Sequence, residues 1–332
     1  MDTIYLVIGL IILIVVFIDI LWTTLWVDGA AGPLSSRLTK LSWKSFRIMS
    51  RDNSKFLSLA GPIILALTLL MWILFIWIGW TLFFAGDETA LIDTQNRGTI
   101  SWTDRIYFTG FTLFTLGIGD FVPKEGFWQV ATTIATGSGM LFVTFGVTYV
   151  LSVIGAVTQK RAFAENITGL AKNGRLIVEQ SWNGTDCHDI DLFLKDQANQ
   201  LTTLTQQHKA YPILHYFHNE HVGEASSVAV AIFDDALTIF AFGLPKQYQP
   251  NRVWLNEART SVQSYIGTLH SAFVNPADSL PPIPNLSYLR SSGLPVVSDK
   301  EFEQSMSELV ERRKQLLGMV EADARRWKEV KK

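Results

Sequence analysis

Residues 101–123 read SWTDRIYFTGFTLFTLGIGDFVP and lie between two long apolar stretches. Ser101 followed by Asp104 three positions later is the pattern of a capping box at the start of a helix. A helix from Ser101 to Phe114 has 14 residues and a length of about 21 Å, which is too short for the roughly 30 Å hydrocarbon core of a bilayer. The glycine-containing segment after it is tolerated at membrane depth only where protein buries it or where it lines a water-filled path. The pattern predicts a re-entrant helix followed by a pore-lining strand.

Three stretches around this segment are apolar enough to span a bilayer: residues 4–18 with their apolar continuation through 25–27, residues 62–84, and residues 126–159. The first lacks the positive start of a signal peptide, so we expect a retained helix. The third has 34 uncharged residues, or about 51 Å of helix, so it should project from the membrane. We therefore predict an all-α integral membrane protein with three transmembrane helices and a re-entrant pore loop.

The charged residues are distributed unequally between the two halves of the chain. Overall 48% of residues are apolar and 17% are charged. Residues 1–159 hold 19 charged positions (9 basic and 10 acidic), and residues 160–332 hold the remaining 39 of 58. This division predicts a membrane-embedded first half and a water-soluble helical second half. The formal net charge of −2 excludes nucleic acid as the main partner, and the single cysteine, Cys187, excludes a disulfide framework and a cysteine-based zinc site.

The loops predict the orientation in the membrane. The connection between the first two spans is basic, whereas the segment after the second span carries Asp87, Glu88 and Asp93. Lys160 and Arg161 follow the third span. By the positive-inside rule, the first connection and the C-terminus are cytoplasmic, and the N-terminus and residues 85–125 face outside. We expect a multi-pass protein of the plasma (inner) membrane.

The first connection also has a helical pattern. Its basic residues recur at spacings of three and four, and apolar residues fall on a neighbouring stripe. This pattern predicts an amphipathic helix in the inner interface whose basic side binds anionic lipid headgroups. A solvated basic linker is the alternative. A voltage sensor requires arginines inside an apolar span, which these are not. The basic residues of the stripe are Arg37, Lys40, Lys44, Arg47 and Arg51.

The stretch from Thr115 to Asp120, TLGIGD, resembles the TVGYGD selectivity filter of potassium channels. The context is similar too, because an outer helix, a short pore helix and an inner helix surround the filter in that family. The resemblance covers roughly residues 60–158. It implies a homotetramer with one filter loop per chain, because four loops in one chain would characterise the related transporters instead.

The residue types suit ion coordination independently of the family. A dehydrated potassium ion needs about eight oxygens per site, which four chains supply as rings of backbone carbonyls. Gly117 and Gly119 reach the backbone conformations that aim successive carbonyls at one axis. We therefore expect K+ to bind at Thr115, Leu116, Gly117 and Ile118. Asp120 should add a ring of carboxylates at the outer mouth.

Position 118 departs from the family, which usually has Tyr or Phe there. Ile118 supplies its carbonyl but cannot make the hydrogen bond of a tyrosine, so Phe111 and Phe114 would have to stiffen the filter by packing. Selectivity for potassium over sodium is the expectation, and a weakly selective monovalent cation channel is the alternative.

The inner helix should begin near Phe127 and bend at Gly139, where the family has its gating hinge. Helical spacing from Gly139 predicts one face that, by similarity, lines the pore or forms the gate. Because nearly every position here is apolar, contact with lipid or packing is the alternative for this face. The predicted residues are Thr136, Gly139, Met140, Val143, Val147 and Leu151.

One ionisable residue, Asp19, lies within a predicted span, and the other two spans contain no Lys or Arg to pair with it. An intramembrane acid is a functional-site hypothesis by default. The alternative is that its side chain reaches the inner surface.

In the second half we expect the inner helix to continue to about residue 184, and further helices over 186–208, 226–243, 252–273 and 300–332. Asp234 and Asp235 favour a buried helix of a bundle over a fourth span for 226–243. The last helix has a heptad interrupted by Arg313 and Asp323, which favours a packed amphipathic helix over a tetrameric coiled coil.

A histidine cluster is the only candidate sensor in the second half. His208, His215, His218 and His221 lie close together in the sequence. His218 and His221 could share a helical face and bind a metal, or sense protons. Histidines that cap or pack a helix are the alternative.

The predicted organisation is an N-terminal transmembrane helix (1–30), a basic interfacial helix (31–58), a pore domain (59–158, with the filter at 115–120) and a cytoplasmic all-helical regulatory domain (159–332). No nucleophile–base pair, phosphate loop or dinucleotide motif is found, so we expect neither an enzyme nor a cofactor, with K+ as the permeant ion. A membrane sensor or scaffold with a non-conducting pore-like module is the alternative function.

Overall fold

The structure is a computed structural model that describes residues 3–26, 31–50, 53–96, 98–327 and 330. The chain forms two compact units. Unit 1 comprises Met1–Trp26, Ala30–Leu41 and Pro62–Val153, and unit 2 comprises Val27–Gly29, Ser42–Gly61 and Ile154–Lys332. Two helices pass from one unit into the other without interruption: α2 (Pro33–Ser50) and α6 (Phe127–Leu170).

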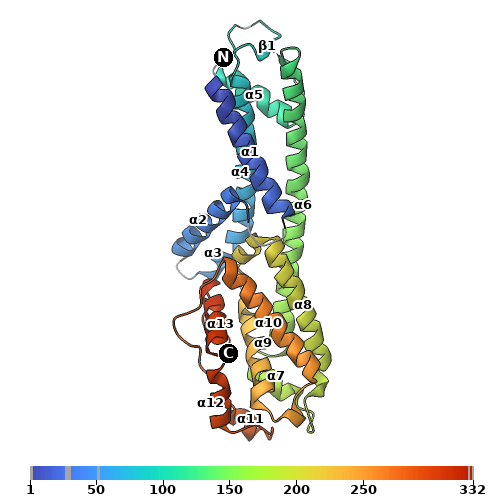
Figure 1. Cartoon of the computed structure of the whole chain (residues 1–332), viewed down its shortest axis with the longest axis vertical. Coiled ribbons are helices and arrows are strands. Elements are labelled where there is room, and N and C mark those ends of the chain that lie inside the picture. The colour runs from blue at the N-terminus through green and yellow to red at the C-terminus, as the bar shows by residue number, and fades with distance from the viewer. Residues whose placement is uncertain (1–2, 27–30, 51–52, 97, 328–329, 331–332) are drawn as a thin grey trace. The chain divides into compact units, whose positions relative to one another are not determined.

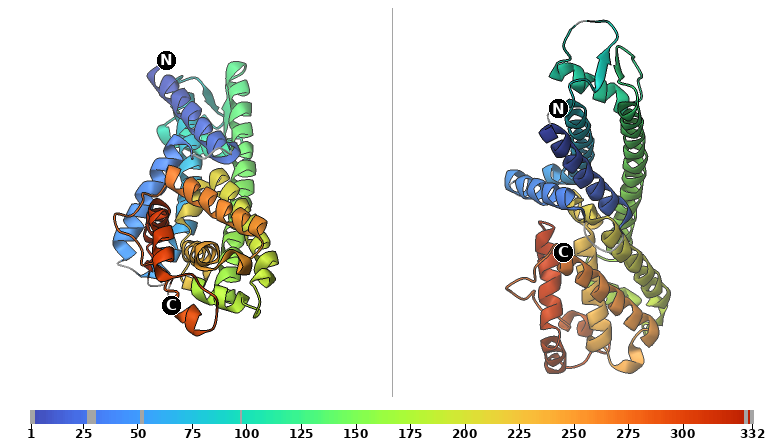
Figure 2. Two further views of the ribbon diagram at one scale, coloured as in Figure 1. Left: turned by 60° about the horizontal axis from the view of Figure 1, so that its bottom comes forward. Right: turned by 45° about the horizontal axis from the view of Figure 1, so that its top comes forward.

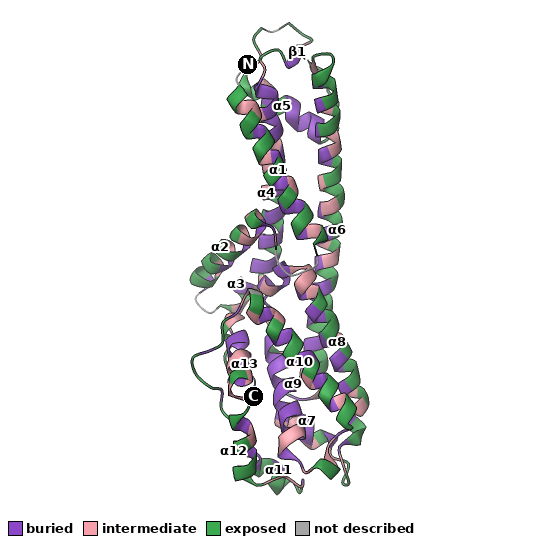
Figure 3. Ribbon diagram, in the orientation of Figure 1, coloured by how far each residue is buried: buried purple, intermediate pink, exposed green. Residues whose placement is uncertain are grey.

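Unit 1 contains the predicted spans as helices (Figure 1). They are α1 (Thr3–Leu25), α4 (Ala60–Ala85) and the first part of α6. By length and composition, these helices can cross a membrane. Most large apolar residues of α1 are exposed in the single chain, and Figure 3 colours exposed residues green. The all-α integral membrane fold predicted from the sequence is therefore confirmed.

The re-entrant segment follows its prediction closely. Helix α5 (Trp102–Leu113) begins at Ser101, whose side chain accepts from the backbone of Asp104 while the Asp104 side chain accepts from the backbone of Ser101. Strands β1 (Leu91–Asp93) and β2 (Phe121–Pro123) pair antiparallel, with Leu91 opposite Pro123. The strand pair closes the loop that carries residues 114–120.

Unit 2 is a helical bundle around α9 (Ser226–Thr238), and α8 lies against α10 in it (Figure 2). Its other helices are α3 (Ser54–Ser58), α7 (Gly174–Ser181), α8 (Asp191–Ala210), α10 (Arg252–Ala272), α11 (Ser287–Ser291), α12 (Asp299–Ser307) and α13 (Val310–Ala322).

Helix α9 and the π-helical turn after it (Ile239–Gly243) form a fourth stretch apolar enough to span a membrane, but 89% of this stretch is buried inside the protein. Asp234 pairs with Arg312, and Asp235 pairs with Arg313 at 3.0 Å. Because protein surrounds α9 on all sides, it is the core helix of unit 2, as its two acidic residues predict.

The inner helix ends earlier than predicted. Helix α6 ends at Leu170 instead of continuing to about 184, because Asn173 caps a new helix by accepting from the backbone of Leu176. Gly174 permits this turn, since a β-carbon there would lie 2.6 Å from the backbone nitrogen of Ala236.

The predicted final helix over 300–332 is two helices, α12 and α13. Its apolar positions are buried in unit 2, Phe302 and Leu316 among them. Arg313 and Asp323, which interrupt the heptad, pair with Asp235 and His218. The interruptions are therefore buried polar contacts of a packed helix.

Candidate functional site

The segment after α5 has an alternating backbone. The φ angle is positive at every second residue: 59° at Thr115, 59° at Gly117 and 87° at Gly119. Leu116 and Ile118 between them do not have positive φ, so the sign of φ alternates along the segment. A backbone with such alternation can direct neighbouring carbonyls to one side of the chain. A side chain is strained at positive φ, which explains glycine at two of the three positions.

Hydrogen bonds hold both ends of this segment. At the inner end, the backbone nitrogen of Leu116 donates to the carbonyl of Phe111 at 2.8 Å. At the outer end, the Thr94 hydroxyl donates to the carbonyl of Gly119 at 3.2 Å. Among the described residues, no donor binds the four carbonyls between these ends, those of Thr115, Leu116, Gly117 and Ile118. These are the four positions predicted to bind K+.

Aromatic side chains pack together near the filter. Phe111 packs edge-on against Tyr107, and Phe114 packs edge-on against Trp77. Ile118 is 51% exposed in the single chain. The two phenylalanines thus have aromatic partners on α4 and α5, and the stiffening of the filter by their packing stays a prediction.

Long-range contacts that the sequence did not indicate fix α5 against α4. The Trp77 indole donates to the carbonyl of Ile106 at 2.9 Å. Arg105 is buried and donates to the carbonyl of Phe84 at 2.6 Å. A lone arginine within the short helix was the one available signal for this anchor.

The inner helix contacts the end of the pore helix through Gly139. A β-carbon at Gly139 would lie 2.1 Å from the carbonyl oxygen of Leu113. Beside it, Ser138 accepts from the Trp80 indole at 2.9 Å. Helix α6 continues through Gly139, so this structure explains the glycine by close packing, and the bend stays a prediction.

The remaining predicted gate residues lie on α6 with different exposure. Thr136 is half-buried, and its hydroxyl donates to the carbonyl of Thr132. The other four are exposed in the single chain: Met140, Val143, Val147 and Leu151. Gly139 is buried and therefore does not share this exposed face.

Asp19 is fully buried and caps the start of α2 from another helix. Its carboxylate accepts from the backbone of Leu34 at 2.7 Å, from the backbone and hydroxyl of Ser35, and from the Trp72 indole at 2.8 Å. A negative charge at a helix N-terminus is favourable. The structure therefore gives Asp19 an anchoring role for α2, in place of the alternative in which its side chain reaches the inner surface.

Helix α2 is the amphipathic helix that the spacing predicts. Two aromatic side chains of its second half pack in unit 2, Trp43 against Tyr216 and Phe46 against Phe56. Leu41, Ile48 and Met49 are exposed. Of the predicted lipid-binding residues, Arg37, Lys40, Lys44 and Arg47 are exposed, and Arg51 lies outside the described residues.

The histidine cluster is not built as a metal site. His218 and His221 do not share a helical face, because the segment containing them is irregular. Both ring nitrogens of His218 have protein partners, Asp323 at 3.0 Å and Ser54 at 2.7 Å. Among the described residues, no three His, Cys, Asp or Glu side chains are grouped as metal ligands.

The other two histidines are close to Lys160 in unit 2. Burial and the charge of Lys160 lower the pKa of His208 to about 3 and that of His215 to about 4. The ring of His215 stacks on the ring of Phe273, and their centroids are 4.8 Å apart. Both imidazoles are therefore neutral at neutral pH, as packed histidines are.

Comparison with known proteins agrees with the geometry of residues 60–158. A sequence model of the ion channel family matches residues 67–156. The uncharacterized membrane protein YdjJ of Bacillus subtilis (strain 168) is 46% identical over 323 residues, which cover 97% of this chain and 95% of that protein. No solved structure matches the chain. The chain therefore belongs to the same family as this membrane protein, and its residues 67–156 match the ion channel family.

Proposed function

We propose that this protein is a homotetrameric potassium channel of the plasma membrane, with its N-terminus outside and unit 2 in the cytoplasm. The observation that carries the proposal is the filter backbone. Positive φ angles at Thr115, Gly117 and Gly119 alternate with residues of negative φ, and the four carbonyls from Thr115 to Ile118 accept no hydrogen bond from the described residues. Such carbonyls replace the hydration shell of a potassium ion.

Four copies are needed because one chain supplies one strand of oxygens. A site with about eight oxygens takes two carbonyls from each of four chains. Leu116 and Ile118 are 66% and 51% exposed in the single chain, which fits side chains that neighbouring copies cover. The C-terminal end of α5 faces the inner end of the filter, and the negative end of its helix dipole favours a cation there.

The gate belongs to the inner part of α6. Val147 and Leu151 are exposed apolar side chains one helical turn apart. Four copies of this face form an apolar constriction that stops ions by losing its water. Unit 2 controls this constriction, since α6 runs without interruption from its contact with the pore helix at Gly139 into unit 2.

Anionic lipid headgroups are the proposed partners of α2. Its exposed residues combine four basic side chains with apolar ones such as Leu41 and Ile48. A helix of this composition lies in the membrane interface, with its basic groups at the headgroups. The buried cap at Asp19 fixes the start of this helix.

Potassium flux from liposomes tests the proposal. Purified full-length protein is reconstituted into vesicles loaded with KCl, and its oligomeric mass in mild detergent is measured in parallel. The proposal predicts a tetramer. It also predicts potassium efflux from vesicles that contain the protein and none from vesicles without protein. A monomer or dimer without flux under any gradient would contradict it and favour a non-conducting sensor or scaffold.

A further inference from the structure

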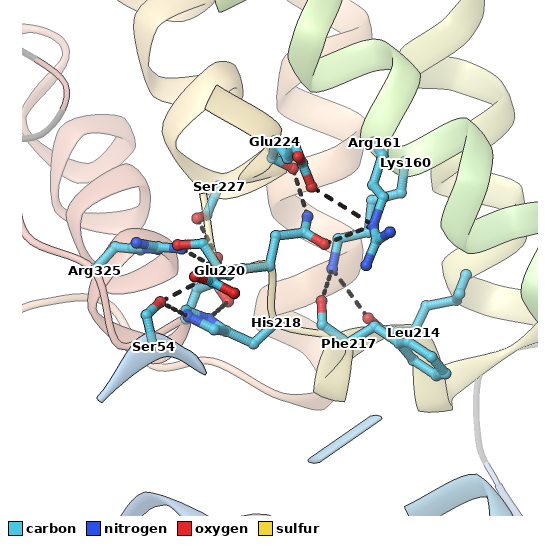
Figure 4. A network of polar contacts seen from close by, with 12 residues as sticks. Ser54, Lys160, Arg161, Leu214, Phe217, His218, Glu220, Glu224, Ser227 and Arg325 are labelled. Atoms are coloured by element: carbon cyan, nitrogen blue, oxygen red, sulfur yellow. Dashed lines mark hydrogen bonds and ion pairs between the residues drawn. The ribbon is translucent and has the colours of Figure 1, made fainter. Parts of the chain in front are cut away.

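The 14 residues 211–224, here called the coupling segment, form all but the last residue of the connection between α8 and α9 in unit 2. The coupling segment contains two short 3-10 turns, Pro212–Tyr216 and Val222–Glu224, with irregular backbone between them. Irregular buried backbone needs hydrogen-bond partners from elsewhere. Polar side chains from three other elements, those of Lys160, Ser54 and Arg325, donate to its backbone carbonyls (Figure 4).

The inner helix is the first of these elements. Lys160 of α6 is 5% exposed, and its ammonium group donates to the carbonyls of Leu214 at 3.1 Å and Phe217 at 3.0 Å. The next residue, Arg161, donates to the Asn219 side chain at 2.8 Å. These are the first two charged residues after the long uncharged stretch of α6.

The segment that leads into the outer helix is the second element. Ser54 of α3 hydrogen-bonds the His218 ring at 2.7 Å, and Lys55 pairs with Glu220 at 3.4 Å. At Gly61, in the first turn of α4, a β-carbon would lie 2.6 Å from the Phe217 ring.

The end of α13 is the third element. Asp323 binds His218 at 3.0 Å and also accepts from the Ser227 hydroxyl. Arg325 donates to the carbonyls of Asn219 and Glu220. The coupling segment thus contacts α6 at Lys160 and Arg161, the segment that leads into α4, and the residues that follow α13.

Among the contacts between α6 and the coupling segment, the hydrogen bonds of Lys160 are the most costly to break, because its ammonium group is buried. An ammonium group out of water needs nearby acceptors and an opposite charge, and losing them is strongly destabilising. The carboxylate that acts on Lys160 is Asp323, and Asp323 is itself held by His218 and Ser227. A shift or rotation of α6 relative to the coupling segment would leave this charge buried without its acceptors. Motion of one is therefore tied to motion of the other.

We propose that the coupling segment transmits the state of unit 2 to the gate, and that Lys160 is the positioning residue that fixes the inner helix to it. This inference rests on the proposed channel function. The coupling segment holds α6, α3 and α13 together, so a change in any of them alters the position of the inner helix.

Single-channel recording of Lys160→Met in the full-length protein tests the inference. Coupling free energies of allosteric proteins correspond to about 5- to 150-fold changes in an equilibrium, so the ratio of open to closed time should change by about that factor. Unitary conductance and reversal potential should stay those of the wild type, because the filter is untouched. Lys160→Arg keeps the charge and should restore the wild-type ratio. Lys172→Met is the control, because Lys172 is exposed just beyond the end of α6.

A wild-type open probability in folded Lys160→Met channels would overturn the inference. If Lys160→Met does not fold, Arg161→Gln and Ser54→Ala decide the question, since each removes a contact at the edge of the same segment; unchanged open probability in both would overturn it.

Hydrogen exchange separates this inference from the proposed function, because it needs no ion flux. Loss of Lys160 should raise amide exchange in residues 211–224 and in the inner part of α6 together. A rise confined to residues 211–224 would overturn the coupling even in a conducting channel. A coupled rise in a protein that conducts no potassium would sink the proposed function and leave the coupling in place.

Discussion

At the scale of single residues, the filter glycines carry the most direct prediction. Gly117→Ala or Gly119→Ala places a β-carbon at a positive φ angle, a strain of about 1–2 kcal/mol per residue in each of four chains. Residues 115–120 should leave their backbone conformation, and potassium conduction should be lost in recordings of either variant. Gly169→Ala is the control, because Gly169 lies in α6 with ordinary φ and open space around it. Normal currents from both filter variants would show that residues 115–120 are not the filter.

Asp19 carries a prediction about the anchoring of α2. Asp19→Ala removes the acceptor for the backbone of Leu34 and Ser35 and for the Trp72 indole. Loss of a helix cap costs roughly 0.5–2 kcal/mol, and the buried indole loses its partner as well. Thermal unfolding should shift downward, and amide exchange should rise in the first turn of α2. Unchanged exchange in that turn would contradict the capping role.

The buried histidines predict acid sensitivity of unit 2. Burial and Lys160 lower the pKa of His208 to about 3 and of His215 to about 4, below the value of about 6.5 in an unfolded chain. The unfolded state therefore takes up protons first as pH falls. Stability should decrease from about pH 6.5 downward, and the loss should continue to about pH 4 for His215 and to about pH 3 for His208.

Melting temperature against pH measures this effect. Burial raises the pKa of Asp323, but the hydrogen bond and charge of His218 outweigh it and bring that pKa to about 2. Protonation of Asp323 therefore affects the stability of unit 2 at a lower pH than protonation of His215 does. His215→Phe keeps the ring that stacks on Phe273 and should flatten the slope between about pH 6.5 and about pH 4. His188→Gln is the control, since hydrogen bonding to Asp191 raises the pKa of exposed His188. An equal slope in the wild type and His215→Phe would contradict the assignment.

At the scale of elements, α6 carries the gate prediction. Leu151 is 65% exposed on the inner part of α6. Leu151→Asp places four carboxylates in the proposed constriction, which should stay hydrated and leak ions in the closed state. Leu192→Asp is the control, because Leu192 is equally apolar and is exposed on α8 of unit 2. In liposome flux assays, ions should leak through the closed channel in Leu151→Asp but not in Leu192→Asp. A Leu151→Asp channel that does not leak would show that the gate lies elsewhere.

The sequence predicts elements whose signals are local. The capping box at Ser101, the span lengths and the three-four spacing of the basic residues in α2 each depend on neighbours in the chain, and each is found where predicted. Contacts between distant residues have no such signal. Asp19 meets Ser35 and Trp72 only because three helices pack together, and the end of α6 at Leu170 depends on the close approach of Gly174 to α9.

At the scale of the whole molecule, the proposed function assigns ion selectivity to unit 1 and the control of opening to unit 2. Unit 1 holds the proposed filter and α5, and unit 2 holds the buried polar contacts of the coupling segment. Selectivity should therefore be insensitive to substitutions in unit 2, and open probability should respond to them. The shared helix α6 is the covalent path between these two properties.

Reversal potential in planar bilayers tests the central claim most directly. The full-length protein is recorded with KCl on one side and NaCl on the other. The alternating filter backbone and its four carbonyls predict a reversal potential near that of a potassium electrode, and Ile118→Tyr should raise the potassium-to-sodium permeability ratio or leave it unchanged. A reversal potential near zero, which means equal permeability to both cations, or a current that follows chloride would contradict a potassium-selective filter at residues 115–120.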